Sequence, residues 1–302
     1  MKVFITGGSG FVGSYLTQKL IQEGQSVTIL TRKIKPGAPL PEGASFTEGD
    51  PTKPGIWQES LAQHDAIINL AGASIFQRWT EKRKKELYDS RIHTTTNIVH
   101  ALAARKGKET HLLSTSAIGY YGFHGDEDLY EDNEPGDDFL AHLARDWEAA
   151  ALKAKEYGVR VVLCRFGVVM GRRGGALSQL VPIFNKYLGA PLGNGKQWFS
   201  WIHEEDLANI FLFLLHHKEV DGPINCTAPN PLRNKELTKI LGEVLHKPTV
   251  FPPVPRFVLR IFLGEFAGVL VKGQRVFPRK LLDHGFTFKY PTIREALHDI
   301  LQ

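Results

Sequence analysis

The 302-residue chain has the composition of an ordinary globular protein, with 42% hydrophobic and 23% charged residues. It contains no apolar run near the roughly 20 residues of a membrane span, and its first residues enter a folded motif instead of a signal peptide. Its net charge of +5 is divided between a cluster at 82–85 and the carboxyl end, with an acidic stretch at 126–138 between them. We therefore expect a cytoplasmic protein with no specific nucleic-acid partner and no membrane partner.

The chain opens with an apolar strand, 2–6, that runs into a glycine-rich turn. Glycine permits a positive φ and lets a phosphate approach the backbone at such a turn. Helical spacing follows, and a helix that begins there directs its free N–H groups and positive dipole end toward the turn. Strand, turn and helix in this order predict a dinucleotide site. Its predicted contacts are Gly7, Gly10, Phe11, Val12 and Gly13.

The end of the second predicted strand indicates which dinucleotide binds. NAD sites carry an acidic residue there, whereas this chain has Thr31, Arg32 and Lys33. A guanidinium can hold a 2′-phosphate through two charge-assisted hydrogen bonds, whereas a carboxylate would repel it. We predict NADP, held by Thr31 and Arg32; the alternative is that Arg32 and Lys33 are solvated loop charges. Asp50, after the third strand, could accept a hydrogen bond from the adenine amine or be a plain turn residue.

Strand-like and helix-like segments alternate through the first half of the chain. This alternation predicts right-handed β–α–β units and a parallel sheet covered by helices on both faces. The expected fold class is α/β, a doubly wound (Rossmann) parallel sheet with a smaller C-terminal substrate lobe. The predicted strands are 2–6, 26–31, 44–48, 65–71, 110–115 and 160–165, and the predicted helices are 11–23, 80–105 and 139–157.

The fourth strand is nearly all apolar and ends in small residues, which is typical of a central strand that opens into a ligand crevice. We expect Leu70, Ala71 and Gly72 to pass close to the cofactor; tight packing alone is the alternative. On the next helix, Arg91 could neutralise a phosphate or align the nicotinamide ribose, and Glu86 could accept a hydroxyl. A surface ion pair is the competing interpretation of these two residues.

The pattern changes after residue 171, where 171–175 is interpreted as a flexible basic connector. Further on, the pattern predicts a helix at 204–217, a strand at 223–226 and a helix at 234–246. The predicted domains are an NADP-binding domain at 1–171 with an interleaved part near 204–226, and a small lobe made of 172–203 and 227–302.

Two isolated cysteines, Cys164 and Cys226, stand at the ends of apparent strands. Their positions lack metal-ligand spacing, so no metal site is predicted. We expect both to be small buried residues in a reducing compartment.

Several segments together resemble the extended short-chain dehydrogenase/reductases, and more narrowly the atypical branch usually labelled epimerase family protein. The superfamily matches are 6–13, 69–72, 114–116 with 121–122, 165–171 and 201–208, and those of the branch are 78–80, 89–92, 117–122, 147–148 and 273–286. The resemblance covers essentially the whole chain. It implies a doubly wound NADP-binding domain with a small C-terminal lobe, and it implies that Arg165 lies near the cofactor.

The chain departs from the superfamily at the catalytic pair. Ordinary members carry Tyr-x-x-x-Lys on the helix after the fifth strand, where the lysine lowers the tyrosine pKa and the phenol moves a proton. Here Phe139 or Leu140 stands at the tyrosine position and Leu143 or Ala144 at the lysine position. The superfamily mechanism therefore cannot be carried over directly.

Other residues could replace that pair. Tyr120 and Tyr121 follow the fifth strand, and Ser116 matches the superfamily's substrate-orienting serine. We expect Tyr121 or Tyr120 to supply the proton and Ser116 the hydrogen bond; the alternative is that both rings pack at the lobe interface. The residues expected to line or support the pocket are Trp198, Trp201 and His203, the last also able to serve as a helix cap.

Two functions are consistent with these observations. The first is an NADP-dependent oxidoreductase or epimerase that acts on a small carbonyl or sugar-nucleotide-like substrate. The second is a catalytically silent NADP(H)-binding regulator. Its role could be in cell division, because parts of the branch that the chain resembles carry a cell-division-inhibitor label. Either could form a homo-oligomer or bind a regulatory protein partner.

Overall fold

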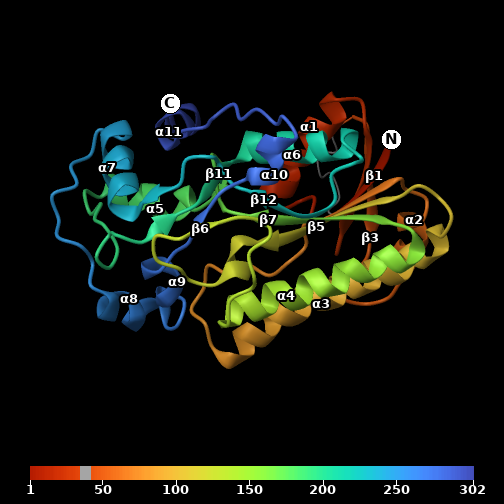
Figure 1. Cartoon of the computed structure of the whole chain (residues 1–302), viewed down its shortest axis with the longest axis horizontal. Coiled ribbons are helices and arrows are strands. Elements are labelled where there is room, and N and C mark those ends of the chain that lie inside the picture. Colours follow the sequence, from red (N-terminus) through yellow and green to blue (C-terminus); the bar gives the residue numbers. More distant parts are fainter. Residues whose placement is uncertain (35–41) are drawn as a thin grey trace.

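Seven strands form one sheet at the centre of the molecule, and every neighbouring pair is parallel (Figure 1). The computed structural model describes residues 1–34 and 42–302. The chain winds outward in both directions from β1 and β4, so the predicted doubly wound α/β fold is confirmed. Across the sheet the strands are β12 (Gly222–Cys226), β7 (Arg160–Phe166), β5 (His111–Ala117), β4 (Ala66–Asn69), β1 (Lys2–Thr6), β2 (Ser26–Thr31) and β3 (Ala44–Glu48).

Helices cover both faces of the sheet (Figure 1). One face packs against α1 (Phe11–Gln22) and α6 (Glu204–His216), and the other against α2 (Trp57–Leu61), α3 (Glu81–Leu102) and α4 (Phe139–Leu152). The alternation within β1 shows why, since Val3 and Ile5 join the first core and Phe4 joins the second. A strand buried on both faces reads as the continuous apolar run that the sequence contains.

The seven predicted strands and five predicted helices are present, with half of their ends unchanged and most of the others shifted by one or two residues. The helix predicted to reach residue 105 ends in the 3-10 turn η1 (Ala103–Arg105). The one predicted over 139–157 likewise changes after Leu152 into η3 (Lys153–Tyr157). Both cysteines are fully buried and unpaired, as the sequence predicts.

The interpretation of 171–175 as a flexible connector is wrong. The segment forms an antiparallel hairpin of β8 (Val168–Gly171) and β9 (Gly174–Gly175). A Cβ added to Gly171 or Gly174 would lie 2.6 or 2.5 Å from the Phe11 ring. These glycines therefore serve close packing against α1, not mobility.

The C-terminal residues build a smaller lobe around a core of their own. That core joins α5 (Leu177–Asn185), α7 (Asn234–Val244) and α11 (Ile293–Leu301) with Trp201 and Tyr290. The predicted domain boundaries stay a prediction, although β12 does lie in the central sheet. The remaining elements of the C-terminal part of the chain are β10 (Trp198–Phe199), β11 (Trp201–His203), β13 (Leu232–Arg233), α8 (Arg256–Leu263), α9 (Ala267–Val271), β14 (Arg275–Val276) and α10 (Arg279–Asp283). Of these, β14 pairs with β6 (Asp128–Leu129). Within the described ranges, no helix has the length and apolar character needed to cross a bilayer.

Candidate functional site

The glycine-rich turn between β1 and α1 is closed tightly by its own backbone. Gly7 has a φ of 73°, and a Cβ added to it would lie 2.8 Å from the carbonyl carbon of Leu70. A Cβ at Gly13 would lie 2.2 Å from the Gly7 carbonyl oxygen, which accepts the Gly10 N–H at 3.0 Å. Glycine is required at both positions, and the bare backbone it leaves is what a phosphate needs for close approach.

The first turn of α1 faces the same point. Gly10 is the N-cap, and no side chain caps the N–H groups that follow it. These groups carry the positive end of the helix dipole, so they favour an anion. The structure therefore brings together the five residues predicted to contact the cofactor pyrophosphate. They are Gly7, Gly10, Phe11, Val12 and Gly13.

A buried polar network holds the end of β4 against this turn. The Thr6 hydroxyl donates to Asn69 Oδ1 at 2.8 Å, and Asn69 Nδ2 donates to Thr95 Oγ1 at 2.9 Å. The amide nitrogen of Ala71 would be 2.9 Å from a Cβ at Gly7. Leu70, Ala71 and Gly72 accordingly lie beside the glycine turn, at the carboxyl edge between β1 and β4 where the winding reverses.

Arg91 lies directly behind this edge. Its guanidinium carbon would be 3.2 Å from a Cβ on Gly72, and its two Nη atoms donate to the carbonyls of Leu87 and Ala73 at 3.0 and 3.1 Å. Desolvation lowers the pKa of Arg91 to about 10, and the charge on Arg83 adds to this effect. Within the described residues no carboxylate pairs with it, so an anion in the crevice would offset the cost of burying its charge.

The ends of β2 and β3 carry the predicted ribose and adenine contacts. Arg32 is exposed and forms no ion pair in the described part of the chain, while Thr31 Oγ1 donates to the Lys33 carbonyl at 3.2 Å. Asp50 accepts from the Thr52 N–H and hydroxyl at 3.0 and 2.7 Å. Burial would raise the pKa of Asp50, but these bonds and the charges of Lys53 and Arg32 lower it. Arg32 thus lies near Asp50 and has no ion-pair partner among the described residues.

Glu86 forms an ion pair near the start of α3. Arg83 Nη1 contacts Glu86 Oε2 at 2.6 Å, and the carboxylate side chain is more than half exposed. The contact of Glu86 with a cofactor hydroxyl stays a prediction. The structure shows the surface ion pair that was its alternative.

Two of the three predicted catalytic residues are corrected, because their polar atoms are engaged inside the protein. The Ser116 hydroxyl donates to Glu148 Oε1 at 2.6 Å, and the Tyr121 hydroxyl donates to Asn225 Oδ1 at 2.7 Å. Tyr121 is fully buried, and burial raises its pKa. Neither hydroxyl faces a substrate.

Arg165 completes this network. Its Nε and Nη2 donate to the two oxygens of Glu148 at 2.8 and 2.9 Å, and its Nη1 donates to the Tyr121 hydroxyl at 2.9 Å. Burial would lower the pKa of Arg165, but Glu148 and Tyr121 raise it. The structure shows Arg165 in a buried ion pair with Glu148, and the cofactor contact that the resemblance implies stays a prediction.

Tyr120 is the predicted catalytic residue that keeps partial exposure. The Arg165 guanidinium lies 3.5 Å from the centre of its ring. Burial raises the pKa of Tyr120, and the Arg165 charge opposes that change. Tyr120 is thus a neutral phenol at physiological pH, held by a cation–π contact at the carboxyl edge of the sheet.

α4 presents an apolar wall where the superfamily pair would stand. Leu140 faces the turn after β5 so closely that a Cβ on Gly119 would lie 3.2 Å from its own. Phe139 packs edge-on against Trp79, and Leu143 is buried in the same cluster. The positions where the superfamily carries its tyrosine and lysine are therefore apolar on this helix.

The three residues expected to line or support the pocket take different roles. Trp198 lines a cavity, whereas Trp201 is fully buried in the C-terminal core. His203 is the N-cap of α6, and its Nδ1 accepts the Glu205 N–H at 3.0 Å. Burial lowers the pKa of His203 to about 4. His203 is therefore a helix-capping residue, which was the alternative interpretation of this position.

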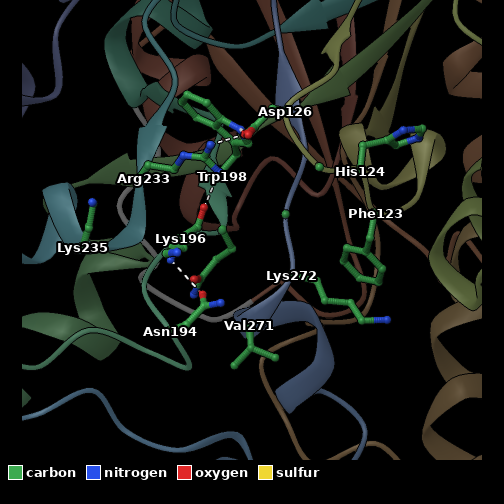
Figure 2. A pocket seen from close by; sticks show the side chains of 13 residues that line it. Phe123, His124, Asp126, Asn194, Lys196, Trp198, Arg233, Lys235, Val271 and Lys272 are labelled. Atoms are coloured by element: carbon green, nitrogen blue, oxygen red, sulfur yellow. Dashed lines mark hydrogen bonds and ion pairs between the residues drawn. The ribbon is translucent and has the colours of Figure 1, made fainter.

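A cavity of about 610 Å³ opens between the C-terminal lobe and the loop after β5 (Figure 2). Its charged lining comprises four cations and the carboxylate of Asp126, which pairs with Arg233. Arg233 also lies over the Trp198 ring, 3.9 Å from its centre. The other cations form no ion pair among the described residues, and they are Lys196, Lys235 and Lys272.

A second cavity of about 300 Å³ adjoins the first through Phe123 and Lys272, which line both. Leu140 of the apolar α4 wall lines it, and so do Arg256 and Arg260 of α8. The two cavities therefore connect the cationic surface of the lobe with the position where the superfamily places its catalytic pair.

Comparison with known proteins assigns this architecture. Residues 3–226 match the NAD-dependent epimerase/dehydratase family, and residues 254–300 match a domain of unknown function, DUF1731. The chain belongs to the NAD-dependent epimerase/dehydratase family.

Relatives in this family match along the whole chain. The epimerase family protein SDR39U1 homolog of Arabidopsis thaliana chloroplasts is 40% identical over 100% of this chain and 87% of its own length. Epimerase family protein YfhF of Bacillus subtilis is 38% identical over 100% of this chain and 98% of its own. The structure of human epimerase family protein SDR39U1 with NADPH superposes with a TM-score of 0.86, at 33% identity and 99% coverage of both chains.

The sequence did not identify the lysines of the cationic cavity in this family member. Lys196 and Lys235 are 39 positions apart, and Lys272 comes from a third segment, so no local motif joins them. The only signal in the sequence was the excess of positive charge in the C-terminal part of the chain.

Proposed function

We propose that this protein is an NADP(H)-dependent oxidoreductase or epimerase that acts on a small carbonyl or sugar-nucleotide-like substrate carrying an anionic group. The observation that carries the proposal is the cationic cavity at the C-terminal lobe, in a protein that also has the β1–β4 crevice. The β1–β4 crevice would hold the cofactor, and the cationic cavity would hold the charged end of the substrate.

The residues present fit a dinucleotide. The turn formed by Gly7 and Gly13 is a cradle that any Cβ would fill, and the uncapped start of α1 supplies N–H donors for a pyrophosphate. Arg91 adds a desolvated cation without a carboxylate partner. NADP(H), when bound, would supply or accept a hydride.

Preference for NADP over NAD rests on Arg32. It is exposed at the end of β2 with no ion pair within the described ranges. A guanidinium bonded to a 2′-phosphate supports a preference of about 10- to 150-fold, from charge-assisted bonds of roughly 1.5–3 kcal/mol. The human relative whose structure holds NADPH is consistent with this choice.

The substrate's charged end would lie among Lys196, Lys235 and Lys272. Three ammonium groups around one cavity repel one another when, as among the described residues, no carboxylate pairs with them, and a phosphoryl group would relieve that repulsion. The volume of about 610 Å³ exceeds what a phosphate fills, which supports an organic substrate with an anionic group.

Tyr120 would transfer the proton to or from the substrate. The other two candidates, Ser116 and Tyr121, are bonded inside the protein. Tyr120 is a partly exposed phenol next to the Arg165 guanidinium, which would stabilise a phenolate formed during the reaction.

A second candidate function is a catalytically silent NADP(H)-binding regulator. The apolar wall of Leu140 and Leu143 favours it, since no acid or base stands where the superfamily places both. The cationic cavity favours the enzyme, because a cofactor sensor does not need a second charged pocket.

The deciding experiment measures NADPH oxidation with carbonyl compounds offered in matched pairs, with and without a phosphoryl group. We expect turnover of a phosphorylated member, with KM raised about tenfold or more by Lys235→Gln. Lys239→Gln is the matched control, because Lys239 lies one turn further along α7 with its side chain 77% exposed. Turnover of no compound by a protein that binds NADPH tightly would favour the regulator.

A further inference from the structure

α8 is an unusual helix because none of its residues is buried. Its large apolar side chains face solvent, with Phe257 67%, Ile261 64% and Phe262 73% exposed. Val250 and Phe251, just before the helix, are exposed as well. Figure 1 shows α8 at the edge of the molecule, away from the central sheet. A contiguous group of this kind on a protein surface marks an interaction site.

Backbone pairing at both ends holds this surface outward. Before the helix, Val254 bridges Leu192, with the Val254 N–H donating to the Pro191 carbonyl at 2.8 Å. After the helix, Gly264 bridges Trp79. The apolar residues of α8 are therefore presented by a fixed segment and not by a frayed one.

The segment that carries the exposed group has charge of a single sign, although Arg256 and Arg260 also line the second cavity together with Asp138 and Glu265. Between residues 248 and 264 the only charged side chains are Arg256 and Arg260, and both are exposed. The next acidic residue, Glu265, is paired with Lys84. Arg256 and Arg260 stand four residues apart along the helix, next to the Phe257 and Ile261 pair with the same spacing.

We propose that α8 and the preceding Val250 and Phe251 form a docking surface for an anionic lipid membrane. Short amphipathic helices with Phe, Leu or Ile on one side and Arg or Lys beside them bind at the headgroup–acyl boundary of such membranes. The proposal adds a peripheral contact to a protein expected from its sequence to have no membrane partner. It does not depend on the proposed enzymatic function.

Two other occupants fit the surface less well. A second copy related by a two-fold axis would bring the Arg256 and Arg260 of both chains together without a carboxylate from either helix. A stable protein partner needs about 800 Å² on each side, whereas α8 is a projecting helix of eight residues, about 12 Å long. A deformable lipid surface needs neither a matching groove nor a large flat area.

The test is co-flotation of the full-length protein with vesicles of phosphatidylcholine alone or mixed with phosphatidylglycerol. We expect binding to the mixed vesicles that weakens with salt. The double variant Phe257→Ser, Phe262→Ser should lower the partition coefficient about tenfold or more. Ile56→Ser is the matched control, because Ile56 is 83% exposed on α2's side of the sheet and should change partitioning by less than about twofold.

Arg256→Gln with Arg260→Gln should remove the preference for phosphatidylglycerol and leave the thermal unfolding of the protein unchanged. The proposal is overturned if the wild-type protein floats with neither vesicle, or if the serine variant binds as the wild type does. It is also overturned if sedimentation equilibrium shows a dimer that the serine variant loses, because the surface would then be covered by a second copy.

Discussion

Gly13 is the residue on which the cofactor site depends most directly. Gly13→Ala would place a Cβ 2.2 Å from the Gly7 carbonyl oxygen, in contact with backbone that cannot move aside. We expect NADPH affinity to fall at least about tenfold and the free energy of unfolding to fall by about 1–3 kcal/mol. Isothermal titration calorimetry and urea unfolding measure the two effects.

Gly268→Ala is the matched control for that substitution. Nothing lies within 4 Å of a Cβ at Gly268, which is inside α9. Alanine there should leave NADPH binding unchanged and stabilise the helix by up to about 1 kcal/mol. An alanine at Gly13 that behaved like the one at Gly268 would contradict the close packing of the turn.

Tyr121 and Tyr120 are adjacent but predicted to matter in different ways. Tyr121→Phe removes a buried hydroxyl that Asn225 and Arg165 both use, so it should lower the free energy of unfolding by about 1–3 kcal/mol. Tyr120→Phe should change stability by less than about 0.5 kcal/mol and reduce turnover by roughly 10²–10⁴. Urea unfolding and NADPH oxidation separate the two residues; a turnover defect confined to Tyr121→Phe would restore the original assignment.

The contrast between these tyrosines shows what the sequence could say about the site. The glycine turn and the end of β4 were predictable, because their chemistry is local to a few consecutive residues. The role of Tyr121 was not predictable, because its hydrogen-bond partners Asn225 and Arg165 lie 104 and 44 positions away in the sequence. A hydroxyl bonded inside the protein and one facing substrate look the same in a sequence.

At the scale of elements, we predict that the free energy of unfolding depends on pH through the junction of β11 and α6. His203 caps α6, and burial lowers its pKa to about 4 from an ordinary value of 6.5, against the opposing charges of Asp299 and Glu205. As the pH falls below 6.5, the unfolded chain takes up this proton before the folded protein does. The free energy of unfolding therefore decreases between pH 6.5 and 4, by about 2 kcal/mol at pH 5.

His203→Asn isolates this contribution, because asparagine offers a capping oxygen in place of the Nδ1 of His203 but cannot titrate. The variant also loses the contact with Tyr290, whose ring centre lies 4.0 Å from that of His203, so its absolute stability will differ. The informative quantity is the change in unfolding free energy from pH 7 to pH 5, measured in urea. That change should be about 2 kcal/mol smaller in the variant; equal changes would contradict a buried, neutral His203.

The elements that the sequence predicted well are those with a simple periodic pattern. Central strands such as β4 are apolar on both faces, and α1 and α6 have one apolar side each. The short strands β8 and β9 were missed because their residues include Gly171, Gly174 and Gly175, which read as a connector. Their pairing is fixed by the Phe11 ring, a contact between distant segments that no local pattern contains.

At the scale of the whole molecule, cofactor binding should stabilise the fold by mass action. A ligand at about 100 times its Kd adds about 2.7 kcal/mol to the free energy of unfolding. NADPH contacts elements from β1 to α3 in the proposed site, so its effect should appear as a higher Tm for the protein as a single cooperative unit. NADH at the same concentration should raise the Tm less, because it lacks the 2′-phosphate.

Arg32→Glu tests whether this difference arises from one guanidinium. The substitution should lower NADPH affinity about 10- to 150-fold while changing NADH affinity far less, so that the two cofactors raise the Tm equally. Lys33→Glu makes the same change of charge one residue along, also at an exposed position. If both substitutions weakened NADPH equally, the effect would come from the general positive field of the loop, since a bidentate contact belongs to one side chain. A loss confined to Arg32 would place the phosphate at the end of β2, where the order of the sheet strands puts the open edge of the crevice.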